Sequence, residues 1–242
     1  MLLINSNMLF SALFEDIGIN VGFNTFRLLG DNLSTQPQLP FPGNMSGGGL
    51  NYIEPGFDIS ATLFLDKNDV HRLIAGIEYI AMNAKEVVAN KAYAYFYAHH
   101  YVNFIDAFCG YHYSFYKAPW QNVRIYSGLE LMFNNTILNE LEWGQKALKN
   151  ATPPSDFYEE KVFYNKSDKF RIGGRIRLGF EGRVKDNIYI GASGTLGIYN
   201  LYKQNDKTGE LFNFQNIYDK TESFQPFFNF LISMQYRFND KN

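Results

Sequence analysis

The stretch that decides the fold is FQPFFNFLISMQYRF, residues 224–238. Counting from Phe224, every second residue is apolar, in the order Phe, Pro, Phe, Phe, Ile, Met, Tyr and Phe. The intervening residues become polar toward the end of the stretch, where Gln235 and Arg237 stand. A period of two predicts a β-strand with two unlike faces. The apolar face must therefore meet either a protein core or lipid.

The same alternation recurs in seven earlier segments. They are residues 16–26, 56–65, 70–82, 101–115, 123–138, 169–183 and 188–199. The connections between the eight segments alternate between long and short, and the short ones carry turn-forming residues such as the Asp-Lys-Asn-Asp of 66–69. This pattern predicts eight antiparallel strands, with the last strand paired to the first.

The second and third long connections contain segments that suggest further structure. The sequence AKEVVANKA at 84–92 suggests a helical turn or two, and YAYFYAHHY at 93–101 suggests an extension of the following strand. The sequence NELEWGQKALKN at 139–150 suggests a short helix. These three expectations concern the region beyond the main strands.

Composition excludes several classes of protein. The formal net charge of −2 over 242 residues argues against a nucleic-acid-binding surface. A single cysteine, Cys109, excludes an internal disulfide and a cysteine zinc site. The chain has no apolar run of about 20 residues, the length that a membrane-spanning helix requires. Barrel strands remain possible, because alternation gives each of them only a weak hydropathy signal.

The faces opposite the apolar ones favour lipid over a soluble core. They combine Gly, Ser and Asn with the charged residues Asp58, Arg72, Glu78, Asp106, Arg124, Glu130, Arg171, Arg175, Arg177, Glu181 and Arg237. A soluble barrel places its apolar residues inside, whereas a membrane barrel places them outside around a polar lumen. A soluble barrel with the apolar faces on its outside would expose an apolar belt larger than a soluble monomer tolerates.

The last strand also resembles a known signal. Its end, Tyr236-Gln-Arg-Phe238, is similar to the C-terminal signal for the barrel-assembly machinery in small eight-stranded outer-membrane barrels. That class includes the OmpA transmembrane domain, OmpX, OmpW and the "outer membrane protein β-barrel" chains of Bacteroidota-like bacteria. The family pattern usually ends on the aromatic residue, whereas here residues 239–242 follow it.

This resemblance implies a fold, a location and partners. The fold is all-β, an eight-stranded antiparallel up-and-down transmembrane β-barrel with short periplasmic turns and long extracellular loops. The location is the outer membrane of a Gram-negative bacterium. The partners are outer-membrane lipids, lipopolysaccharide, the barrel-assembly machinery during biogenesis and other envelope proteins, and not nucleic acid.

We expect three regions along the chain. Residues 1–15 form an N-terminal segment, a remnant of targeting or a periplasmic extension; residues 16–238 form the barrel; and residues 239–242 form a tail. The start, MLLINSNMLFSALFED, lacks a basic region and a clear cleavage site, so it does not match an intact signal peptide. We therefore expect a mature or truncated chain, or a wrongly assigned start.

An ion network is predicted in the lumen. Its members are Glu78, Asp106, Arg124, Glu130, Arg171, Arg175, Arg177 and Glu181. Counting residues from the short turns places Glu130 near Arg175 and Arg177, and Arg124 near Glu181. The network is either a selective polar pathway or a structural filling of a lumen that eight strands leave only wide enough for side chains. Buried charges need partners in both cases, and we favour the structural role.

The four histidines are candidates for catalysis or metal binding. His112 and Ser114 share a strand face but lie near the expected periplasmic end. His99 and His100 lie at the expected external rim and point to opposite faces of the strand. We therefore predict no catalytic, metal or cofactor site.

Residues expected to form the aromatic girdle and the assembly signal are Trp120, Phe228, Tyr236 and Phe238.

Three functions are compatible with the sequence. The leading hypothesis is a non-enzymatic integral outer-membrane protein with a structural, adhesion or loop-binding role, because loops on a rigid scaffold are the usual place for binding. The first alternative is an outer-membrane subunit of a larger envelope or secretion complex. The second is a lipid A-modifying enzyme.

Overall fold

The computed structural model describes most of the chain. The described residues are 16–30, 34–36, 39–41, 44–46, 48–91, 93–118, 123–157, 160–164, 170–202, 211–212 and 222–238. Their regular structure consists of strands. None of these residues belongs to a helix long and apolar enough to cross a membrane. The expected segments 1–15 and 239–242 lie outside the described residues.

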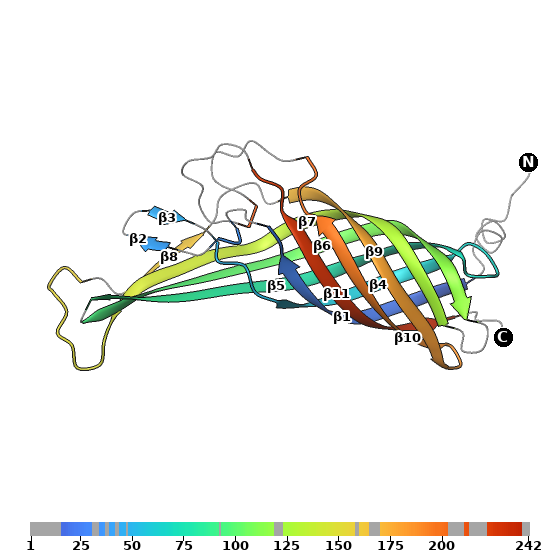
Figure 1. Ribbon diagram of the computed structural model, residues 1–242, viewed down its shortest axis with the longest axis horizontal. Coiled ribbons are helices and arrows are strands. Elements are labelled where there is room, and N and C mark those ends of the chain that lie inside the picture. The colour runs from blue at the N-terminus through green and yellow to red at the C-terminus, as the bar shows by residue number, and fades with distance from the viewer. Residues whose placement is uncertain are drawn as a thin grey trace, which may run out of the picture.

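Eight strands pair into a closed antiparallel ring (Figure 1). In ring order they are β1 (Asp16–Leu28), β4 (Glu54–Phe64), β5 (His71–Lys91), β6 (Ala94–Ala118), β7 (Val123–Ala147), β9 (Phe170–Lys185), β10 (Ile188–Ile198) and β11 (Pro226–Arg237). The last strand pairs with the first, with Gly18 opposite Arg237 and Leu28 opposite Phe227. The predicted eight-stranded barrel and its closing pair are confirmed. Outside the ring lie β2 (Leu39–Phe41), β3 (Asn44–Ser46) and β8 (Glu160–Tyr164).

The two ends of the barrel differ, and we call them the short-turn end and the long-loop end. The short-turn end carries the connections β4–β5, β6–β7 and β9–β10, the last of which has only two residues between its strands. The Asp66 carboxylate accepts N–H bonds from Asn68 at 2.9 Å, Val70 at 3.1 Å and His71 at 2.6 Å. Partial burial opposes ionisation, but these bonds outweigh it and lower the pKa of Asp66.

Three ring strands continue past the long-loop end as a separate sheet. We call it the protruding sheet: residues 83–91 of β5, 94–103 of β6, 138–147 of β7, and β8. Figure 1 shows it extending along the long axis, away from the barrel. The helical expectations for 84–92 and 139–150 are therefore wrong. The expected extension of the strand through 93–101 is confirmed from Ala94 onward, where β6 begins. Pairing on a partner strand has overridden local helix propensity here.

Exposed apolar side chains surround the barrel in a band that we call the apolar belt. Its members include Ile17, Ile19, Val21, Phe23, Ile59, Ile77, Tyr79, Ile105, Leu129, Leu131, Phe133, Ile176, Leu178, Phe180, Ile190, Leu196, Phe228, Phe230, Ile232 and Met234. Exposed apolar side chains become sparse where the protruding sheet begins, and in its described residues they are Val87 and Val162, 55% and 44% exposed. On the same outward face, Tyr79 of β5 gives way to Asn83 and Lys85, and Ile105 of β6 gives way to Tyr101.

Candidate functional site: the lumen and the protruding sheet

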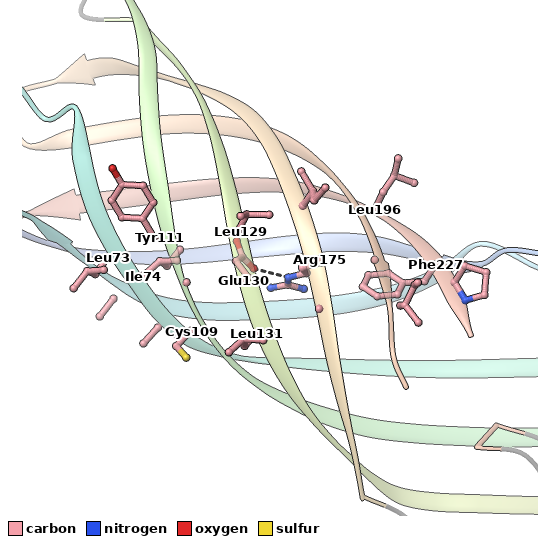
Figure 2. Close-up of a pocket in the computed structure, with 18 of the residues that line it drawn as sticks. Leu73, Ile74, Cys109, Tyr111, Leu129, Glu130, Leu131, Arg175, Leu196 and Phe227 are labelled. Carbon is pink, nitrogen blue, oxygen red and sulfur yellow. Dashed lines mark hydrogen bonds and ion pairs between the residues drawn. The ribbon is translucent and has the colours of Figure 1, made fainter. Parts of the chain in front are cut away.

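The centre of the lumen is organised around Glu130. Its carboxylate accepts bonds from Arg175 Nε at 2.5 Å and from Arg177 Nε at 2.5 Å, and it lies 2.8 Å from His112 Nε2. All four side chains are at least 96% buried. Figure 2 shows Glu130 and Arg175 pointing toward each other from adjacent strands. The positive charges of the two arginines offset the cost of burying the negative carboxylate, and its charge offsets the cost of burying theirs.

A second carboxylate extends this cluster across the lumen. Glu78 on β5 accepts a bond from Arg175 Nη1 at 2.5 Å and further bonds from the amide groups of Asn24 and Asn229. The Arg175 guanidinium lies 4.4 Å from the centre of the Phe108 ring. Arg175 therefore joins β9 to β5 through Glu78 and to β7 through Glu130.

A separate cluster closes the short-turn end. Glu181 bonds to Arg72 at 2.9 Å, Arg237 at 2.8 Å and Arg124 at 3.3 Å. Asp69, from the β4–β5 turn, reaches Arg124 at 3.0 Å and Arg237 at 3.2 Å. Arg237, which the alternation places on the polar face of the last strand, is completely buried in this mouth of the lumen.

Aromatic rings fill the long-loop end. Phe26, Phe104, Tyr199, Phe212 and Phe227 are each fully buried and lie 4.4–5.6 Å apart, measured between the centres of contacting rings. Phe212 belongs to the β10–β11 connection, so this connection contributes a ring to the packing. The described part of the lumen is thus packed with side chains at both ends and in the middle.

Hydrogen bonds to Asp106 and an ion pair between Arg171 and Glu222 also stabilise the long-loop end. Tyr199 Oη donates to Asp106 at 2.8 Å, and the Asn134 amide donates to the other oxygen of the same carboxylate at 2.8 Å. Arg171 donates to Glu222 Oε2 from Nε at 2.9 Å and from Nη2 at 2.7 Å, and its Nε also lies 3.2 Å from Oε1. Glu222 precedes β11, so this pair ties the last long connection to β9.

The predicted network residues thus fall into distinct groups. Glu78, Glu130, Arg175 and Arg177 meet in the central cluster, and Arg124 meets Glu181 at the short-turn end. Asp106 and Arg171 have other partners, given above. The list omitted Arg72, His112 and Arg237, although the alternation places them on the polar faces of their strands. It also omitted Asp69 and Glu222, because both lie in connections, where the period of two gives no information about facing.

The predicted girdle residues are only partly described. Phe228, Tyr236 and Phe238 are 39%, 49% and 54% exposed and point outward, and the rings of Tyr236 and Phe238 lie 5.3 Å apart. Trp120 lies outside the described residues.

Each histidine has a defined environment. His100 is fully buried at the base of the protruding sheet, with Nδ1 2.8 Å from the Gly48 carbonyl and Nε2 2.6 Å from Asn139 Oδ1. Burial lowers the pKa of His100 and outweighs these bonds, which raise it. His71 is exposed and lies 2.5 Å from Tyr111 Oη. Within the described ranges, no three His, Cys, Asp or Glu side chains are grouped to hold a metal.

An apolar groove of about 1110 Å³ crosses the strands in the middle of the belt (Figure 2). Ala61, Ala75 and Cys109 lie in one register row of this groove, and Leu73 and Tyr111 belong to the adjoining row. Small outward side chains beside large ones create the depression. These lining side chains face outward, whereas Ile74, Glu130, Arg175 and Phe227, which also line the groove, are buried on the opposite face of the same strands.

Two solved structures are distant likenesses of this chain. No protein-family model matches the chain, and no curated protein matches it significantly. The attachment invasion locus protein Ail of Yersinia pestis is similar in structure, with 11% identity, a TM-score of 0.40, and coverage of 92% of this chain and 98% of that one. Neisserial surface protein A has 11% identity, a TM-score of 0.44, and coverage of 92% and 97%. The fold assignment rests on this chain's own pairing, which closes an eight-stranded antiparallel barrel.

Proposed function

We propose that the protein is a non-enzymatic integral protein of the bacterial outer membrane. In this proposal the barrel anchors the protruding sheet at the cell surface, where the sheet serves adhesion or binding, and the short-turn end faces the periplasm. The observation that carries the proposal is the coincidence of two boundaries. On β5 and β6 the belt runs to Tyr79 and Ile105, and the protruding sheet begins within four residues of each. Val87 and Val162 are the exposed large apolar side chains described beyond this boundary in the sheet.

The packing of the lumen supports anchoring over transport. An open channel requires a continuous water path, and eight strands leave a lumen only wide enough for side chains. Here Arg237 and Glu130 occupy the short-turn end and the centre, and Phe104 occupies the long-loop end, each at most 3% exposed. A packed lumen makes the barrel a rigid support for what it displays.

The orientation is testable with two epitope insertions. One follows Asn150, an exposed residue between β7 and β8, and the other follows Asp186, in the β9–β10 turn. We expect antibody to bind the first epitope on intact cells and the second only after the outer membrane is permeabilised. Both proteins should fractionate with outer membranes. The reverse labelling pattern, or recovery in another fraction, would contradict the proposal.

A further inference from the structure

An aromatic ladder runs along β6 through the protruding sheet. Its members are Tyr95, Tyr97, His99 and Tyr101, which alternate along the strand and therefore share one face. The ring centres of Tyr97 and His99 lie 5.4 Å apart, and those of His99 and Tyr101 lie 6.2 Å apart. At about 3.3 Å per residue, the four side chains span about 20 Å along the strand.

The neighbouring strands give this ladder a polar margin. His99 lies opposite Lys85 of β5 on one side and Glu142 of β7 on the other. Tyr101 lies between Asn83 and Glu140 in the same way. Groups that donate and accept hydrogen bonds therefore border the rings nearest the barrel.

The adjacent accessible rings of the ladder lie at its barrel end, because the buried Tyr97 separates Tyr95 from His99 and Tyr101. Tyr97 is only 2% exposed, with Lys146 Nζ 4.6 Å from its ring centre. Tyr95, His99 and Tyr101 are half-buried, so a part of each side chain is accessible. The surface open to a ligand is therefore formed mainly by His99 and Tyr101 with their polar neighbours.

The ladder continues the outward face of the barrel. β6 has the same pairing with β5 from Tyr113 to Tyr95, so Tyr101 and His99 lie on the face that carries Ile105 and Cys109 in the belt. A lipid whose chains cover Ile105 places its headgroup beside Tyr101 and His99. This continuity indicates what molecule meets the ladder first.

We propose that the ladder binds the core sugars in the headgroup of an outer-leaflet glycolipid. This proposal rests on the proposed outer-membrane location. The C–H faces of sugar rings are slightly positive and stack on the negative faces of aromatic rings. Sugar hydroxyls and phosphates can bond to the Lys85, Glu142 and Asn83 side chains beside them. The protein would thereby recognise the lipid surface in which it stands.

The test measures binding of two purified lipids to the detergent-solubilised protein. Lipopolysaccharide with a complete core oligosaccharide is compared with lipid A, which lacks the core sugars. We expect the complete molecule to bind about tenfold more tightly, since stacking on one aromatic ring contributes an amount of that order. The double variant His99→Ala, Tyr101→Ala should lose this preference and bind lipid A as the wild type does.

Tyr113→Ala is the matched control, because Tyr113 lies on the same face of β6 at the short-turn end and is 43% exposed. It should keep the preference for the complete molecule. Equal binding of both lipids by the wild type, or an unchanged preference in the folded double variant, would overturn the proposal. Equally tight binding of the free core oligosaccharide would overturn the assignment to a membrane lipid. None of these results alters the epitope labelling, so the two proposals fail separately.

Discussion

Glu130→Ala is expected to lower the free energy of unfolding by about 3–5 kcal/mol, because it leaves buried charges without their partner. Arg175 and Arg177 both donate to this carboxylate at 2.5 Å, and their side chains are at most 4% exposed. Arg175 retains Glu78, but Arg177 loses its only ion-pair partner among the described residues. The measurement is urea unfolding of the protein folded into lipid vesicles, with tryptophan fluorescence as the signal for unfolding.

Asp156→Ala is the control for this variant, because Asp156 is exposed in the connection between β7 and β8. It removes the same kind of charge at the surface and should change the free energy of unfolding by less than about 0.5 kcal/mol. If Glu130→Ala were as mild as Asp156→Ala, the central cluster would not stabilise the barrel.

Gly110→Ala is expected to destabilise the barrel by about 3 kcal/mol through overpacking. Gly110 lies opposite Glu130 in the β6–β7 pair. A Cβ atom at this position would lie 2.3 Å from the Leu129 carbonyl oxygen and 2.6 Å from Glu130 Cγ. The first of these atoms is backbone, so relief requires the strands to move apart. The same urea titration measures the loss.

Gly194→Ala is the matched control for the glycine variant. It makes the same substitution in β10, where the nearest atom to an added Cβ is 3.7 Å away, in the Phe228 ring. This ordinary van der Waals contact should leave stability nearly unchanged. Equal effects of the two substitutions would show that the close approach at Gly110 does not limit the packing of the lumen.

The strands of the ring were predictable from sequence because their two faces meet different surroundings. Alternation follows wherever one face meets lipid or solvent and the other meets the lumen. It weakens in the protruding sheet, where Phe96 and Tyr97, adjacent on β6, are both buried. A residue such as Glu142 suits a helix as well as an exposed strand position. Only its pairing with His99 decides between them.

The central ion cluster was predictable for the same reason, since counting from the short turns places Glu130 beside Arg175 and Arg177. The partners from connections were not. Asp69 and Glu222 reach the lumen from segments whose path depends on tertiary structure. The burial of His100 was also unpredictable, because it depends on Gly48, 52 residues earlier in the chain.

The closed barrel is tested most directly by gel migration of the detergent-extracted protein with and without heating. A closed β-barrel stays folded in cold sodium dodecyl sulfate and unfolds when boiled. The pairing of β1 with β11 predicts that the unheated sample migrates faster than the boiled one. Identical migration of the two samples would contradict the closed ring.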